Sequence, residues 1–157
     1  MAITYEPIAT TTLSTSASDV TFSSIPGTYT DLVLVLNGTS TATAGLGFQF
    51  NGDTGNNYSA TLLYGTGSGA VSSRNSNTSE GYSGRINTNQ SVSISYIMNY
   101  SNTTTYKTAI TRANSNGDII MANVCLWRST SAITSIKYQG ATFQSGCVFT
   151  LYGIKAA

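Results

Sequence analysis

The sequence predicts an all-β protein: an antiparallel, jelly-roll-like β-sandwich of about ten strands with no substantial helix. Three observations carry this prediction. Apolar and polar residues alternate in short runs, as in strands that bury one face. Turn signals separate the runs about every 8–12 residues. No segment repeats its apolar residues at the helical period of 3.6. Residues 1–157 are expected to form a single domain, because the chain is too short for two ordinary cores.

The first half of the chain contains the clearest strand patterns. Residues 19–25 alternate and end at a Pro-Gly turn. Residues 31–38, DLVLVLNG, form a continuous apolar run, which is typical of a fully buried central strand. Residues 46–52 place three large apolar side chains on one side. Residues 58–65 are expected to return beside them, so that 51–57 would be a hairpin turn.

The second half adds further strands joined by turns. The Asn-Gly sequence at 116–117 is a strong hairpin signal, and NTT at 102–104 predicts another. In 91–101, alternate apolar residues share one face, and a strand of this pattern has one buried face. These residues are Val92, Ile94, Tyr96 and Met98. The expected strands of this half are 91–101, 105–113, 118–129, 132–140 and 147–154.

Two segments lack a strand pattern of this quality. Residues 65–84 are rich in Gly, Ser and Asn, and predict a long exposed loop with at most a short strand near 70–73. Residues 1–12 are expected to form an extended N-terminal arm. Loops as long as 65–84 are usually functional or mobile, so this segment is a candidate contact region.

The composition excludes several classes of partner. Only 8% of the residues are charged, against about 25% in typical proteins, and the net charge is +1. Nucleic acid and anionic membranes need clustered Lys and Arg, so neither is an expected partner. The longest apolar run, LVLVL at 32–36, is too short to span a membrane. The N-terminal MAITYEPIATTTL has neither the basic nor the apolar region of a secretory signal.

The sequence predicts no catalytic residue and therefore no enzyme. The chain has no histidine, which removes the commonest general base and the usual nucleophile pairs. Asp19, Asp31 and Asp118 adjoin turns, where Asp commonly bonds local backbone. Asp53 and Glu80 are the acids that could meet as a glycosidase pair, although nothing in the sequence places them together.

No metal or cofactor is predicted either. Cys125 and Cys147 lie in apolar runs and are expected to be small buried residues; structural zinc needs four Cys or His ligands. The stretch FNGDTGNNY, 50–58, offers one carboxylate, Asp53, and does not match the ligand spacing of an EF-hand. A tight hairpin turn is the favoured interpretation of this stretch. A weak calcium site built from backbone carbonyls and a contact-forming tip stay alternatives.

Several segments together resemble a family of small virion proteins of tailed bacteriophages, over nearly the whole chain. The resembling segments are YEPIATTTLS (5–14), VTFSSIPGTYTDLVLVLN (20–37), FNGDTGNNYS (50–59), IMNYSNTTTYKTAITRAN (97–114), LWRSTSAITSI (126–136) and FTLYGIKAA (149–157). The resemblance implies a β-fold virion part made in the cytoplasm of a bacterial host, with no catalytic motif to carry over.

The function expected from this resemblance is that of a capsid decoration, or cement, protein. It would form homo-oligomers, expected to be trimers, and bind the major capsid protein. The expected partner-binding residues belong to the N-terminal segment and to the segment around 74–85. They are Ile3, Tyr5, Pro7, Ile8, Arg74, Glu80, Tyr82 and Arg85.

The alternative is a receptor- or glycan-binding module of a tail fibre or baseplate. In that case the Tyr/Asn/Gly-rich stretches 51–58 and 65–84 would contact sugar, because exposed Tyr, Asn and Gly are typical of adaptable binding surfaces. The many tyrosines of the strands are equally compatible with positions at the edge of the core. A lyase or hydrolase is disfavoured, since no acid pair is evident.

Overall fold

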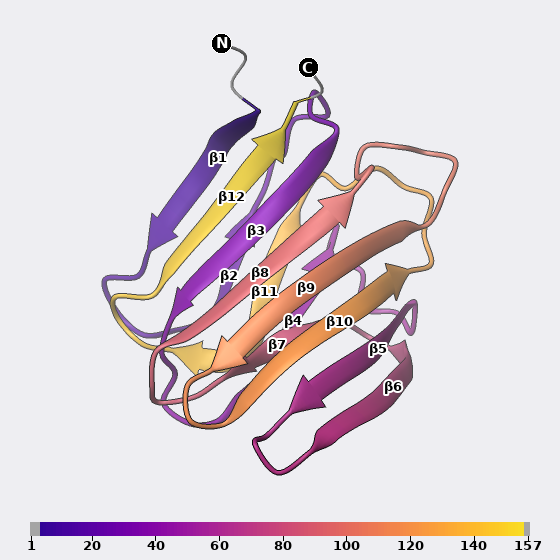
Figure 1. Ribbon diagram of the computed structural model, residues 1–157. Helices are drawn as coiled ribbons and strands as arrows, with labels where there is room; N and C mark the ends of the chain where they lie inside the picture. The colour runs from indigo at the N-terminus through magenta and orange to yellow at the C-terminus, as the bar shows by residue number, and fades with distance from the viewer. Residues whose placement is uncertain (1–3, 156–157) are drawn as a thin grey trace.

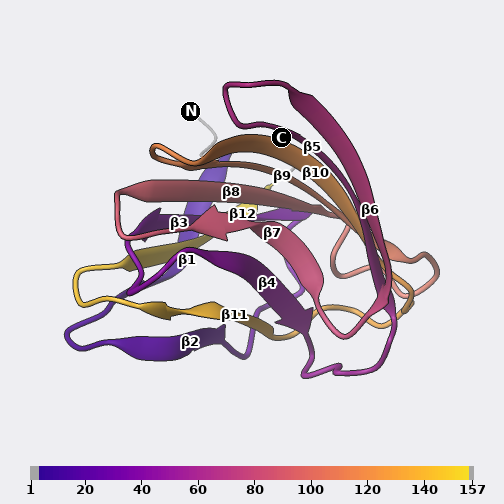
Figure 2. The same ribbon diagram turned by 90° about the horizontal axis from the view of Figure 1, so that it is seen from below.

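The structure, a computed structural model, describes residues 4–155 and forms two antiparallel sheets packed face to face (Figures 1 and 2). The described residues contain no helix, and hence none that could cross a membrane. The large sheet has the order β1 (Tyr5–Thr12), β12 (Val148–Ile154), β3 (Asp31–Gly38), β8 (Ser91–Met98), β9 (Lys107–Ser115), β10 (Ile119–Trp127), β5 (Tyr58–Gly65), β6 (Ala70–Thr78). The small sheet has the order β2 (Ala17–Phe22), β11 (Ile136–Phe143), β4 (Ala44–Phe50), β7 (Gly81–Ile86).

The strand pairing confirms the predicted jelly-roll-like sandwich, with twelve strands in place of about ten. Pairs are nested along the chain: β1 with β12, β2 with β11, β3 with β8, β4 with β7, and β5 with β6. Successive pairs alternate between the large and the small sheet. The hairpin of β9 and β10 widens the large sheet between β8 and β5.

The core lies between the two sheets and is rich in aromatic side chains. Phe50 packs edge-on against Trp127, with ring centroids 5.4 Å apart, and Phe143 packs in the same way against Phe149 at 4.9 Å. The predicted central strand, β3, is confirmed between β12 and β8. Cys125 and Cys147 are buried and unpaired, as expected, and burial raises the pKa of the Cys125 thiol to about 12.

The predicted hairpin of residues 46–52 and 58–65 is wrong. β4 belongs to the small sheet and β5 to the large sheet, so residues 51–57 cross from one sheet to the other. β4 pairs instead with β11 and β7, and β5 with β10 and β6. Alternation shows that a segment is a strand with a buried face, but it does not show which strand lies beside it.

Residues 65–84 are not a long loop. They contain all of β6 and the first residues of β7. β6 is the last strand of the large sheet, and most of its residues are exposed on both faces, so no apolar alternation is needed. Figure 2 shows the large sheet curving at β5 and β6, so that β6 overhangs the small sheet.

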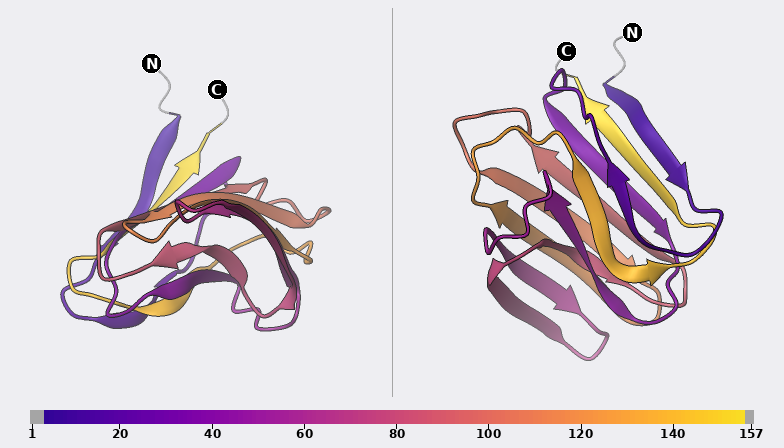
Figure 3. Two further views of the ribbon diagram at one scale, coloured as in Figure 1. Left: turned by 60° about the horizontal axis from the view of Figure 1, so that its bottom comes forward. Right: turned by 180° about the vertical axis from the view of Figure 1, so that it is seen from behind.

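The N-terminal segment is also more ordered than an arm. Ile3 lies outside the described residues, but Tyr5–Thr12 form the edge strand β1, paired with β12 (Figure 3). The register shifts between Pro7 and Ala9. Pro cannot donate a ladder hydrogen bond, and an edge strand tolerates this because only one side of it is paired.

The buried face predicted for β8 is the opposite of the observed one. Ser91, Ser93 and Ser95 are buried, whereas the alternate apolar residues point away from the core. Small side chains are required here because β7 packs closely: a Cβ at Gly84 would lie 2.6 Å from the Cβ of Ala113 on β9. The serines are also hydrogen-bonded; Ser93 Oγ donates to the carbonyl of Ser83, 2.7 Å away.

Candidate functional site

The two acids that could have formed a catalytic pair have separate structural partners. Asp53 accepts hydrogen bonds from Trp127 Nε1 (2.7 Å), Asn57 Nδ2 (2.9 Å) and the backbone N–H of Gly55 (2.8 Å). Partial desolvation raises the pKa of Asp53, but these hydrogen bonds together hold it below its ordinary value. Glu80 accepts a hydrogen bond from Gln139 Nε2 on β11, at 2.7 Å.

Other acids are engaged in local contacts of the same kind. Asp118 forms an ion pair with Arg85 at 3.4 Å, and Glu6 forms one with Lys155 at 2.8 Å. Asp31 accepts a hydrogen bond from the backbone N–H of Asn99. Within residues 4–155, no three His, Cys, Asp or Glu side chains form a group that could hold a metal ion.

The stretch FNGDTGNNY organises neighbouring loops. Asn51, which adopts a positive φ of 54°, accepts hydrogen bonds through Oδ1 from the N–H groups of Thr134 (2.8 Å) and Ser135 (3.1 Å). Its Nδ2 donates to the carbonyl of Ala132 at 2.8 Å. The polar side chains that suggested an ion-binding loop thus bind the crossover to the segment before β11.

The most extensive candidate interaction surface is the side of the large sheet that faces away from the core. We call it the outer face, defined by apolar residues of β8, β9, β10 and β5. These are Val92, Ile94, Tyr96, Met98, Ile110, Ile120, Val124 and Leu63. Met98, Ile110, Ile120, Val124 and Leu63 are exposed, up to 73% for Ile120. Contiguous exposed apolar surface of this kind marks interaction sites.

Register places the members of the outer face beside one another. Tyr96 on β8 pairs with Ile110 on β9, and Ile110 pairs with Val124 on β10. One cation lies among them: Arg112, between Ile94 and Ala122. Its Nη2 donates to the Tyr96 hydroxyl at 3.3 Å, and its guanidinium carbon is 5.7 Å from the centroid of that ring. The outer face is therefore apolar and almost free of charge.

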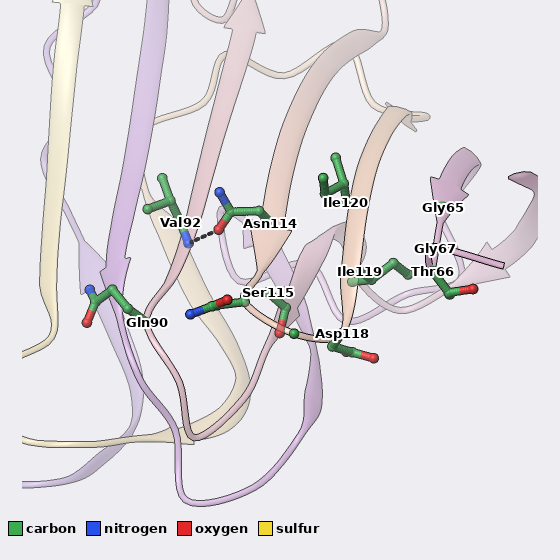
Figure 4. A pocket seen from close by; sticks show the side chains of 12 residues that line it. Gly65, Thr66, Gly67, Gln90, Val92, Asn114, Ser115, Asp118, Ile119 and Ile120 are labelled. Atoms are coloured by element: carbon green, nitrogen blue, oxygen red, sulfur yellow. Dashed lines mark hydrogen bonds between the residues drawn. The ribbon is translucent and has the colours of Figure 1, made fainter. Parts of the chain in front are cut away.

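The outer face ends in a hollow where the turns after β5 and β9 approach β8 (Figure 4). Its volume is about 560 Å³. Figure 4 shows Val92 and Asn114 side by side, and the Val92 N–H donates to Asn114 Oδ1 at 3.3 Å. A second hollow of about 670 Å³ adjoins Leu63, Arg112 and Ile120. Ile120 and Gly65 line both hollows, so a partner side chain could enter on either side of Ile120.

A second, more polar site lies at the edge of the sandwich, where β6 overhangs β7. We call it the edge groove. It consists of two hollows of about 260 Å³ and 340 Å³ that share Asn75 and Tyr82. The first is also lined by Leu62, Tyr64, Ser73, Arg85, Ile119 and Met121. The second is also lined by Asn56, Asn77, Thr78, Ser79 and Glu80.

The tyrosine shared by both hollows is held in place by its surroundings. A Cβ at Gly45 would lie 3.3 Å from Cε2 of Tyr82, so the glycine leaves room for this ring against β4. Burial raises the pKa of Tyr82, while the neighbouring Arg85 lowers it and Asp118 and Tyr64 raise it slightly. Tyr64, Tyr82 and Arg85 line the groove, and Asp118 is paired with Arg85.

The predicted partner-binding residues fall into separate regions. Tyr5 and Pro7 are exposed on β1, while Ile8 is half-buried against the core. Arg74 is exposed on β6, at the other end of the large sheet. The remaining three are brought together in the edge groove: Glu80, Tyr82 and Arg85.

The outer face is not predicted by the sequence. The alternation in β8 predicts that its apolar residues face the core, because an apolar side chain beside serine is ordinarily the buried one. The available signal was the run of three alternate serines, Ser91, Ser93 and Ser95, which fits a close approach of another strand.

Comparisons with known proteins show no family for this chain. No protein-family model and no curated protein matches the sequence. Solved structures with a similar backbone path include the alginate lyase Aly36B, which is 16% identical. The match covers 92% of this chain and 77% of the lyase, with a TM-score of 0.35. Galectin LEC-6 of Caenorhabditis elegans is 10% identical. The match covers 90% of this chain and 94% of the galectin, with a TM-score of 0.41. A tetrameric galectin of the ball sponge Cinachyrella is 10% identical. The match covers 87% of this chain and 99% of the galectin, with a TM-score of 0.37. Likenesses this weak carry no conclusion about function.

Proposed function

We propose that this protein is a non-enzymatic structural component of a bacteriophage virion, a capsid decoration protein that forms homotrimers and binds the major capsid protein. The observation that supports it best is the outer face: a contiguous apolar surface on a rigid sheet, with Arg112 as its cation. We assign the capsid contact to this face. Burial of apolar area supplies the affinity, and attachment stabilises the assembled shell by mass action.

The rest of the molecule is compatible with this assignment. A decoration protein needs an apolar face that is desolvated when it binds the capsid, and a polar surface elsewhere. β6, at the end of the large sheet, presents mainly Ser and Asn. Tyr5 and Pro7 are exposed at the opposite end of the sheet, and we assign the contact with a neighbouring copy to this edge.

The double variant Ile110→Lys/Val124→Glu tests the outer face. The two residues are direct cross-strand neighbours, so the new charges can pair and the fold is preserved. We expect this variant to bind particles that lack the protein at least about tenfold more weakly than wild type, because it places charge at the centre of an apolar contact. Binding is measured by sedimentation with particles, and folding by circular dichroism.

Thr21→Glu is the matched control. Thr21 is exposed on β2 of the small sheet, opposite Lys137 of β11, so the new charge lies outside the outer face. It should bind particles like wild type. Equal binding by the double variant and wild type would exclude the outer face as the contact.

Copy number separates a decoration protein from a tail component. Gel densitometry of purified virions should give on the order of hundreds of copies per particle, as expected when every capsid unit carries the protein. A count of a few copies would contradict decoration and favour a tail-fibre or baseplate module.

A further inference from the structure

The edge groove has the size and position of a ligand site that the capsid contact does not use. Its two hollows, about 260 Å³ and 340 Å³, adjoin at Asn75 and Tyr82, and small-molecule sites are typically about 300–1,000 Å³. It lies between the end strands β6 and β7, whereas the outer face is on the other side of the large sheet. The groove shares Tyr64 and Met121 with the hollow beside Leu63, whereas Ser73, Asn75 and Tyr82 line the groove alone.

Four polar side chains of the edge groove are free to bind a ligand. Within residues 4–155, the side-chain hydroxyls of Tyr64, Ser73 and Tyr82 and the amide of Asn75 form no hydrogen bond with another protein group. The hydrogen bond that Asn123 Nδ2 donates to Tyr82 is accepted by the backbone carbonyl and leaves the hydroxyl free. Hydroxyls and amides both donate and accept, and such pairs suit the hydroxyl groups of a sugar.

Aromatic rings stand on both walls of the groove. Tyr64 comes from β5 and Tyr82 from β7, and both are half-buried, so part of each ring remains accessible. A tyrosine combines an apolar ring with a polar tip, which fits a ligand that has apolar C–H faces and a polar rim. Sugar rings have this construction.

The charges of the groove select against an acidic ligand. The cation Arg85 is paired with Asp118 at 3.4 Å, and Glu80 adds a further carboxylate in the adjoining hollow. A ligand with carboxylate, sulfate or phosphate groups would therefore meet a site with no unpaired cation in the described groove lining. An uncharged ligand has no such penalty.

We propose that the edge groove binds a neutral oligosaccharide, stacked on Tyr82 and Tyr64 and hydrogen-bonded by Asn75 and Ser73. The groove joins the stretches 51–58 and 65–84, through Asn56 on one side and β6 on the other. Its two adjoining hollows accommodate more than one sugar unit. Asn75 and Tyr82 do not line the hollows of the outer face, so a copy attached to the capsid through that face would still present them to a glycan.

Isothermal titration with defined sugars tests the proposal. The probes are neutral hexasaccharides of glucose, mannose and galactose, and a hexasaccharide of galacturonic acid as the acidic comparison. At least one neutral probe should bind with a Kd of about 1 mM or tighter, and more tightly than the acidic one. Tyr82→Ala and Asn75→Ala should each weaken binding, by about tenfold for the tyrosine.

Tyr106→Ala is the matched control, because Tyr106 is 55% exposed in the loop between β8 and β9 and does not line the groove. It should leave binding unchanged. Asn75 lies on the exposed strand β6, so its variant tests the groove even if Tyr82→Ala fails to fold. The proposal is overturned if no neutral probe binds below about 10 mM, if the acidic probe binds more tightly, or if Asn75→Ala binds like wild type.

The same variants separate this inference from the capsid contact. Ile110→Lys/Val124→Glu should retain sugar binding, and Asn75→Ala should retain particle binding. Loss of sugar binding in both variants would show that the groove is not an independent site and would contradict the inference.

Discussion

At the scale of single residues, Asp53 shows how a candidate for chemistry acts as a structural group. Its carboxylate joins the crossover between the sheets to Trp127, which is buried. The sequence identified Asp53 as the carboxylate of its stretch. It did not identify the partner, because Trp127 lies 74 positions away and meets Asp53 only after β5 and β10 have paired.

Asp53→Ala is expected to lower the free energy of unfolding by about 1.5–3 kcal/mol, since it leaves the indole N–H of Trp127 buried without its charged acceptor. Urea unfolding followed by fluorescence of the single tryptophan measures the loss. Asp19→Ala is the control: Asp19 is exposed and accepts a hydrogen bond from Ser18, so its loss should stay within about 0.5 kcal/mol. Equal stability of the two variants would contradict the assigned role.

The same carboxylate predicts a dependence of stability on pH. The pKa of Asp53 is lower in the folded protein than in the unfolded chain. The unfolded chain therefore binds the proton first as the pH falls, and stability is lost below the unfolded pKa of about 3.9 until the folded pKa has been passed. Above that range the contribution is complete. Asp53→Ala should lose less stability than wild type between about pH 5 and pH 2.

At the scale of elements, β8 shows why alternation alone is ambiguous. Its serines lie on the buried face with Ile97, and Val92, Ile94, Tyr96 and Met98 face outward. Ser95 and Thr111 form a buried hydroxyl pair between β8 and β9, with 2.8 Å between their oxygens. The close approach of β7 makes small hydrogen-bonded side chains the better fit on this face.

Ser95→Ala should destabilise the protein by about 1 kcal/mol, because Thr111 loses its buried partner. Ser95→Ala/Thr111→Val should cost less than the sum of the two single changes, since neither polar group is then left unpaired. Chemical unfolding of the four proteins gives the coupling energy. Ser72→Ala on the exposed strand β6 should have little effect. Strict additivity of the two core changes would show that the hydroxyl pair does not contribute.

At the scale of the whole molecule, nested pairing makes the two sheets depend on both ends of the chain. β11 lies between β2 and β4, and β12 lies between β1 and β3. β1 and β2 are therefore held in their sheets by strands more than a hundred residues away. Contacts of this range form a single cooperative unit.

A chain that ends at Thr134 should consequently fail to fold, because β1 and β2 lose their partners and the inner strands β3 and β4 become edges. Amide dispersion in an NMR spectrum measures this. A chain that ends at Ile154 keeps all twelve strands and should remain dispersed. A well-dispersed spectrum from the shorter chain would show that the first ten strands fold alone.

The all-β class, the well-alternating strands and the burial of the cysteines can be predicted from the amino-acid sequence, which also contains no histidine. Each of these follows from local pattern or composition. Three features appear only in the folded protein: β5 leaves β4 for the other sheet, β6 is a strand, and β8 turns its serines inward. A period of two defines two faces of a strand equally well. Which face is buried depends on what packs against it, and in β8 that is β7, so the outer face and the edge groove exist only once the sheets have assembled.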